Sequence, residues 1–150
     1  MIKGRPPRLY RVFPDAPLYF VTFCTRDRKR VLSLYATHNA FQAYAAKALD
    51  QFNVAVGRYV IMPDHIHLFV RGGPNFLLAR WVSGLKRAIS VKLGLRNQLW
   101  QPGFFDHVLR SDESYGEKWQ YVRENPVRAG LTAQAEDWSH QGEFVVIDRA

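Results

Sequence analysis

Residues 54–71 restrict the fold more than any other part of the chain, because they hold two strand-like segments separated by a two-residue break. Both segments are rich in β-branched and aromatic residues, which favour strands. The break is Pro63-Asp64, two residue types that favour turns. A connection this short leaves no room for a crossover, so strands over residues 54–62 and 65–71 are predicted to pair as an antiparallel hairpin.

Strands and helices alternate on both sides of this hairpin. Residues 18–25 form a predicted first strand and residues 104–109 a short last strand. Helical spacing predicts a helix over residues 37–52, with Thr37 or Asn39 as its N-cap, and another over residues 76–93, closed by Gly94. The positions expected to be buried in these helices are Phe41, Tyr44, Ala48 and Phe52, and then Leu77, Trp81, Leu85 and Ile89.

A third helix follows the last strand. Ser111 and Asp112 are its candidate caps, and Asn125 ends it, because a residue before proline is pushed out of the α region. The predicted order is therefore β-α-β-β-α-β with an extra C-terminal helix. This order is typical of an α+β, ferredoxin-like (split βαβ) fold, in which an antiparallel sheet carries two helices on one face.

Strand alternation divides the residues of the 65–71 strand between the two faces of the sheet. Ile66, Leu68 and Val70 share one face, while His65, His67 and Phe69 share the other. We expect the all-aliphatic face to meet the two helices. The histidines then lie on the partly open face, where Phe69 either packs or stacks on an unpaired base.

The chain is strongly basic. Lys and Arg outnumber Asp and Glu by 21 to 13, which gives a net charge of +8. Fifteen of the 21 basic residues are arginine, the side chain suited to bidentate phosphate contacts. This balance indicates a nucleic-acid surface, which gains affinity by releasing counterions. Candidate DNA contacts are Arg5, Arg8, Arg26, Arg28, Lys29, Arg30, Lys86, Arg87, Arg123 and Arg128.

The length of 150 residues predicts a single domain, residues 1–150, with a basic extended arm at residues 1–17 and a C-terminal tail at residues 132–150. The single cysteine, Cys24, has no partner for an internal disulfide bond. No apolar run reaches the ~20 residues of a membrane span, and no secretory signal follows the basic N-terminus. We therefore expect a cytoplasmic protein without membrane partners.

The first candidate for chemistry is the pair His65 and His67, which are two apart on a strand and so present both imidazoles to one face. The second is Tyr121 with Asn125, four apart on the predicted third helix and therefore on one face of it. Two imidazoles and one amide oxygen leave open positions for water and phosphate oxygens. That set suits Mg²⁺ or Mn²⁺ better than a closed zinc site.

A metal ion bound to a phosphodiester would make its phosphorus more open to attack by Tyr121. That attack would give a covalent phosphotyrosine. Tyr115 is the rival tyrosine, but with Trp119 and Val122 it forms an apolar stripe that is typical of a buried helix face. His107, beside Asp106, is a candidate for orienting the metal site or contacting DNA. A purely structural histidine is the alternative at that position.

Three motifs carry a resemblance to a known family. MPDHIHLFV (62–70) and YVRENPVRAGL (121–131) together resemble the HUH superfamily of single-tyrosine DNA nucleases, and more narrowly the insertion-sequence-200-like transposases. WQPGFFDHVLR (100–110) resembles one branch of them, the REP-associated tyrosine transposases. Transposases of the parent type more often place Gln where this chain has Asn125, which favours the REP-associated branch.

The resemblance implies roles for four residues: His65 and His67 as metal ligands, Asn125 as the third ligand and Tyr121 as the nucleophile. It implies a transposase that cuts and joins single-stranded DNA beside small hairpins, leaving a 5′-phosphotyrosine and a 3′-hydroxyl. Transposition and the processing of REP elements both remain open, as do a monomer and a homodimer that shares its tyrosine helix. The main alternative is a non-catalytic binder of structured single-stranded DNA or RNA on the same scaffold. A general RNA-binding domain ranks last.

Overall fold

The computed structural model describes residues 16–95, 98–110 and 113–147. The elements are β1 (Leu18–Cys24), η1 (Arg26–Arg28), α1 (Tyr35–Phe52), β2 (Ala55–Ile61), β3 (His65–Arg71), α2 (Leu78–Lys92), β4 (Phe105–Leu109), α3 (Tyr115–Val122), α4 (Asn125–Arg128), η2 (Ala135–Asp137) and β5 (Gln141–Glu143). The predicted basic arm falls almost entirely outside the described residues, as do Arg5, Arg8 and the two candidate caps Ser111 and Asp112. No helix of the described ranges is long and apolar enough to cross a membrane.

The sheet has the order β4-β1-β3-β2-β5, and every neighbouring pair is antiparallel. Its first four strands have the split βαβ order, so the predicted fold class is confirmed. β2 and β3 form the predicted hairpin, in which Ile61 pairs with Ile66. The central position of β3 follows from the two crossovers through α1 and α2.

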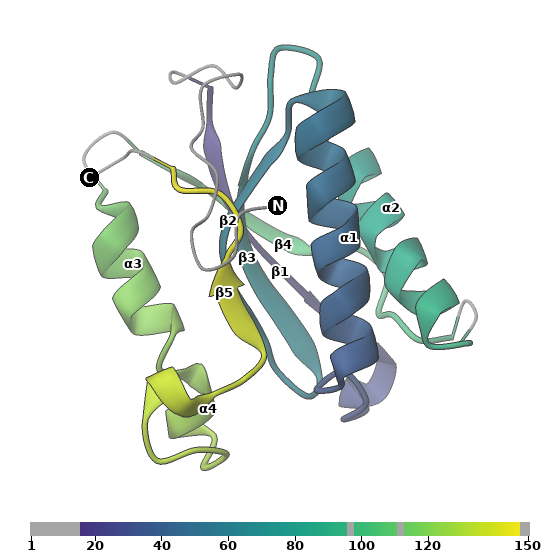
Figure 1. Ribbon diagram of the computed structural model, residues 1–150, viewed down its shortest axis with the longest axis vertical. Helices are drawn as coiled ribbons and strands as arrows, with labels where there is room; N and C mark the ends of the chain where they lie inside the picture. Colours follow the sequence, from purple (N-terminus) through teal and green to yellow (C-terminus); the bar gives the residue numbers. More distant parts are fainter. Residues whose placement is uncertain (1–15, 96–97, 111–112, 148–150) are drawn as a thin grey trace.

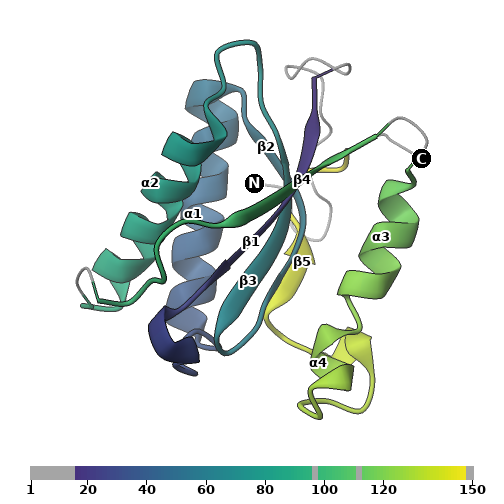
Figure 2. The ribbon, with the colours of Figure 1, turned by 180° about the vertical axis from the view of Figure 1, so that it is seen from behind.

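The structure has three layers, with α1 and α2 on one face of the sheet and α3 on the other (Figures 1 and 2). Ile66, Leu68 and Val70 belong to the core under α1 and α2, as strand alternation predicts. Phe69 belongs to a second core with Tyr115 of α3. Phe69 is fully buried, so of its two expected roles packing is the one the structure shows, and α3 covers part of the face expected to be open.

The C-terminal segment differs most from its prediction as a tail. β5 extends the sheet by pairing with β2, and Val145 and Ile147 beyond it are buried. The indole nitrogen of Trp138 donates to the Ile61 carbonyl over 3.1 Å and fixes the segment to the sheet edge. These contacts were not predicted because residues 141–143 have no strand-like alternation of apolar side chains.

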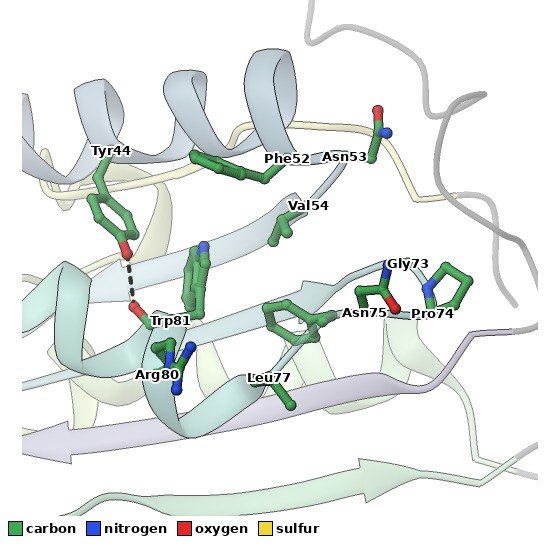
Figure 3. Close-up of a pocket in the computed structure, with 11 residues that line it drawn as sticks. Tyr44, Phe52, Asn53, Val54, Gly73, Pro74, Asn75, Leu77, Arg80 and Trp81 are labelled. Atoms are coloured by element: carbon green, nitrogen blue, oxygen red, sulfur yellow. Dashed lines mark hydrogen bonds between the residues drawn. The ribbon is translucent and has the colours of Figure 1, made fainter.

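Two residues of the predicted buried stripes are exposed instead. Phe52 is 64% exposed and Leu77 is 60% exposed. Both line a cavity of about 450 Å³ between the end of α1 and the start of α2, beside Tyr44 and Trp81 (Figure 3). The Tyr44 hydroxyl donates to the Trp81 carbonyl over 2.9 Å and holds the helices together there. Phe52 is the last residue of α1 and Leu77 immediately precedes α2, so both lie at helix ends.

Helix ends also differ from their predictions. α1 begins at Tyr35 after Leu34, so the two predicted caps, Thr37 and Asn39, lie inside the helix. α2 does end where Gly94, at φ +68°, reverses the chain. α3 begins after Ser114, whose hydroxyl accepts a hydrogen bond from the Glu117 amide over 3.2 Å. That Ser-x-x-Glu spacing is a capping signal that the sequence already carries.

Candidate active site

The two histidines lie side by side on β3. The ring centroids of His65 and His67 are 4.7 Å apart, and the ring of His67 stacks on Phe20 of β1 at 5.5 Å. Ile66 between them points to the opposite face, where it is fully buried. The predicted pair on one face of the sheet is therefore present.

Each imidazole uses Nδ1 for a hydrogen bond. Nδ1 of His67 lies 2.7 Å from the Thr22 hydroxyl, and Nδ1 of His65 donates to Asp64 over 2.7 Å. Arg28 Nε donates to the other carboxylate oxygen of Asp64 over 2.9 Å. Within the described part of the chain, Nε2 of neither ring forms a hydrogen bond. A histidine that ligates a metal is typically held in this way, through its other ring nitrogen.

The electrostatics keep the pair neutral. Burial lowers the pKa of His67 to about 3, and the charges of His65, Arg128, Arg28 and Lys118 act in the same direction. Burial also lowers the pKa of His65, although hydrogen bonding to the neighbouring carboxylate opposes this effect. Neutral imidazoles bind metal ions without first losing a proton, so this environment favours a ligand role.

α3 is docked on the histidine side of the sheet by its apolar stripe. Tyr115, Trp119 and Val122 are all buried, as the helical spacing predicts. The Tyr115 hydroxyl accepts a hydrogen bond from the Arg58 amide over 2.7 Å, at the irregularity in β2. Gly57 makes room for this hydroxyl, because a Cβ there would lie 2.4 Å from it. Burial raises the pKa of Tyr115, although the hydrogen bond from the Arg58 amide acts in the opposite direction. A buried hydroxyl with a raised pKa is a poor candidate for the nucleophile.

Tyr121 and Asn125 do not share one helix, contrary to the prediction. α3 ends at Val122, and Asn125 begins the separate short helix α4 with Pro126 in its first turn. Pro126 thus lies in the first turn of a helix, where its fixed φ is favourable. The Asn125 side chain turns back to α3, where Nδ2 donates to the Val122 carbonyl over 2.8 Å.

His65 and His67 can form a site for a divalent ion only if the side-chain amide of Asn125 is the third ligand. The described residues contain no group of three His, Cys, Asp and Glu side chains that could hold a metal. The Nδ2 bond of Asn125 leaves its side-chain oxygen as an available ligand atom. His65, His67 and Asn125 would therefore provide two nitrogens and one oxygen, with positions left for the oxygens of a phosphate.

Tyr121 is 67% exposed and its hydroxyl is free of hydrogen bonds to the described residues. The guanidinium of Arg128 lies over its ring, with Cζ 4.3 Å from the ring centroid. The charge of Arg128 also lowers the pKa of His67. The same guanidinium therefore acts on Tyr121 and on the histidine pair.

The remaining predicted residues lie in different places. His107 pairs with Phe20 and so lies on the histidine face, but its Nε2 contacts Glu113 at 3.0 Å. Asp106 pairs with Val21 and therefore faces the side of α1 and α2. Lys86 donates to the carbonyls of Gln101 and Gly103, so it fixes a loop rather than standing free. Arg26 is half-buried, whereas Lys29 and Arg30 are exposed. Arg87 is also exposed, but it lies on α2, on the opposite face of the sheet from the histidines. Arg123 contacts Gln120 and Glu136.

Sequence reasoning missed three residues that belong to the site. Thr22 holds His67, Asp64 holds His65, and Lys118 lies over the Phe20 ring at 5.2 Å. The position of Asp64 next to His65 was a usable signal. Thr22 was not identifiable, because only the β1–β3 register places it opposite His67.

The family model described as "Transposase IS200 like" matches residues 17–125, from the residue before β1 to the first residue of α4. The chain belongs to this transposase family. A REP-associated tyrosine transposase of Escherichia coli is 31% identical over 130 residues, 85% of this chain and 77% of the relative. A relative from Haemophilus influenzae is 26% identical over 145 residues, 87% of this chain and 81% of its own length.

The fold has a solved counterpart, a REP-associated tyrosine transposase bound to a REP hairpin. The two share 22% identity with a TM-score of 0.72, over 94% of this chain and 82% of that one. The predicted resemblance is thus confirmed, and the chain is a DNA-processing enzyme of the tyrosine transposase class rather than a non-catalytic binder.

Proposed function

We propose that this transposase cleaves and rejoins single-stranded DNA through Tyr121, at a site that His65, His67 and Asn125 complete. The observation that carries the proposal is the pair of imidazoles of lowered pKa, each held through Nδ1 and each with an Nε2 that forms no hydrogen bond to the described residues. A metal-ligating histidine is held through one ring nitrogen and offers the other to the ion, and both rings have this arrangement.

In the cleavage step, the Tyr121 hydroxyl oxygen attacks the phosphorus of a DNA phosphodiester. A bond forms between the tyrosine oxygen and phosphorus, and the bond from phosphorus to the 3′ oxygen breaks. The phenolic proton leaves to solvent, and the departing oxygen takes up a proton as a 3′-hydroxyl. The product is a 5′-phosphotyrosine, whose bond energy lets a second 3′-hydroxyl reverse the step and join a new strand.

His65, His67 and Asn125 are the residues that would hold Mg²⁺ or Mn²⁺. Such an ion, when bound, makes the phosphorus more electrophilic and neutralises charge on the phosphate oxygens. The chain itself supplies the surrounding positive charge. Arg28, Lys118 and Arg128 all act on His67, so the site is basic from three elements. A polyanionic strand is the substrate that this field attracts.

A hairpin beside the cleavage site is the expected form of the DNA. The similar solved structure holds a REP hairpin, and this chain has a net charge of +8 that suits such a partner. Arg26, Lys29 and Arg30, in the segment around η1, stand beside Arg28 at the histidine end of the sheet. We expect this segment to contribute phosphate contacts, which hold a strand in register without reading its sequence.

The test incubates the full chain with a hairpin-containing single-stranded oligonucleotide and Mn²⁺ and maps any covalent adduct by mass spectrometry. The adduct should lie on Tyr121, and Tyr121→Phe should abolish it while binding of the oligonucleotide stays within about twofold. Tyr115→Phe is the matched control on the same helix. It should keep cleavage activity and lose about 1 to 3 kcal/mol of stability, because the Arg58 amide is left without its partner. Equal cleavage by Tyr121→Phe would refute the assignment.

The metal arm of the test uses the double variant of His65 and His67 to Ala. It should lose the response of cleavage to Mn²⁺ or Mg²⁺, and a chelator should stop the wild-type reaction. Cleavage that persists in chelator would contradict a metal site at these residues.

A further inference from the structure

Arg128 is unusual among the basic residues because its contacts are to the tyrosine itself. Its Nη2 donates to the Tyr121 backbone carbonyl over 2.9 Å, and its Cζ lies 4.3 Å from the centroid of the Tyr121 ring. One guanidinium therefore contacts both the backbone and the side chain of the same residue. A planar, five-donor group can stack on the ring while one N–H points at the carbonyl, whereas an ammonium group lacks this fixed planar geometry.

The chain geometry fixes where Arg128 comes from. The carbonyl of Tyr121 lies in the last turn of α3, where it accepts a hydrogen bond from the Glu124 amide over 3.3 Å, and Arg128 adds a side-chain donor to it. α4 turns the chain back so that two of its side chains satisfy neighbouring carbonyls: Arg128 that of Tyr121, and Asn125 that of Val122. Pro126 starts this return turn. The nucleophile and the proposed third ligand are therefore oriented by one short helix.

Tyr121 needs such support. Its side chain is 67% exposed, and among the described residues its one ring contact is with the Arg128 guanidinium. An exposed tyrosine without this contact would move among several rotamers, and each rotamer places the hydroxyl at a different point relative to the phosphate. Attack in line on phosphorus requires one of these positions.

We infer that Arg128 is a positioning residue that holds Tyr121 for attack, rather than a contact to the DNA backbone. This inference rests on the proposed role of Tyr121. It also revises the expectation that Arg128 binds phosphate. The contacts that the structure gives Arg128 are to the Tyr121 carbonyl and ring, and a phosphate contact through its remaining N–H groups is the rival role that the kinetics below separate.

The two roles predict opposite kinetics. A positioning residue acts on the chemical step, so Arg128→Ala should lower the single-turnover rate of adduct formation by about 10- to 100-fold, with the Kd for the hairpin oligonucleotide within twofold of wild type. The dependence of log Kd on log salt should not change. A phosphate contact acts on binding, and its loss would weaken affinity and reduce that slope by about 0.7 to 1.

Arg128→Lys makes the test independent of how well Arg128→Ala folds. Lysine keeps the charge, so it would restore a phosphate contact, but it lacks the planar fork and should leave the rate at least fivefold low. Arg80→Ala, on the opposite face at α2, removes the same charge and should react at the wild-type rate. The fold of each variant is checked by its unfolding midpoint.

Three results would overturn the inference: full activity in Arg128→Lys, an unchanged rate in Arg128→Ala with or without a changed salt slope, or a faster rate in Arg128→Ala, which would mean that Arg128 restrains Tyr121 in an unreactive position. A wild-type chain that forms no adduct at Tyr121 refutes the proposed function itself. An adduct in wild type and an equal rate in Arg128→Ala refute only the role of Arg128.

Discussion

Thr22 offers the sharpest test of the histidine site, because it touches His67 without being a proposed ligand. Its hydroxyl lies 2.7 Å from Nδ1 of His67, and the two residues are directly opposite in the β1–β3 register. Thr22→Val keeps the β-branched shape and removes only this hydrogen-bonding group. The imidazole then loses the partner that sets its orientation and tautomer, while Nε2 remains available.

The expected loss follows from this single bond. Removing such a supporting partner typically costs 10- to 100-fold in metal affinity, or about 1.4 to 2.7 kcal/mol. The metal-free protein should lose about 1 to 3 kcal/mol of stability, because Nδ1 of a largely buried ring is left without a partner. Calorimetric titration with Mn²⁺ measures the first quantity, and urea unfolding without metal measures the second.

Thr22→Ser is the matched control, because serine keeps the hydroxyl. It should stay within about threefold of wild type in Mn²⁺ affinity, and the cleavage rate at saturating Mn²⁺ should follow the same order. If Thr22→Val binds Mn²⁺ as tightly as wild type, the hydrogen bond does not orient a ligand. If the serine variant loses as much as the valine variant, packing rather than the hydroxyl is responsible.

Three further predictions concern the scaffold. Phe69→Ala should cost about 3 to 5 kcal/mol in urea unfolding, because the ring is fully buried under α3; a loss below 1 kcal/mol would contradict that packing. Burial lowers the pKa of both His38 and His140, so the unfolded chain binds more protons below about pH 6.5, and the free energy of unfolding should fall from pH 7 to pH 5. His38→Gln should reduce this change of the unfolding free energy with pH, and an unchanged pH dependence would refute the contribution of His38. Gly142→Ala should destabilise the β5 edge by about 1 to 3 kcal/mol, because its Cβ would lie 2.8 Å from the Tyr59 hydroxyl; a neutral effect in the same assay would show that the ring moves aside.

The order of strands and helices was predictable from local pattern. The break at Pro63-Asp64, the alternation around Ile66 and the spacing of Tyr115, Trp119 and Val122 are short-range signals, and the structure confirms each of them. The predictions for Phe52 and Leu77 were wrong because helical periodicity identifies an apolar stripe without showing how far the sheet beneath it extends. β5 was missed because its pairing depends on the exposed edge of β2 and not on its own residues.

The four proposed site residues were identifiable from motifs, but their arrangement was not. Sequence spacing put Tyr121 and Asn125 on one helix, whereas a break after Val122 puts them on two. Asn125, the residue before Pro126, was expected to end the helix, whereas α3 ends at Val122 and Asn125 is the first residue of α4. What the spacing did not show is that Pro126 would begin another helix and return its side chains to the first.

Local periodicity and composition are enough to predict the split βαβ order, the face on which His65 and His67 lie, and the basic charge that suits DNA. The tertiary structure decided which residues hold those histidines and the tyrosine. Thr22 reaches His67 only through the pairing of β1 with β3, and Arg128 reaches Tyr121 only through the turn between α3 and α4. Contacts between segments depend on register and on helix ends, and one residue's difference in either would place a different side chain at the site.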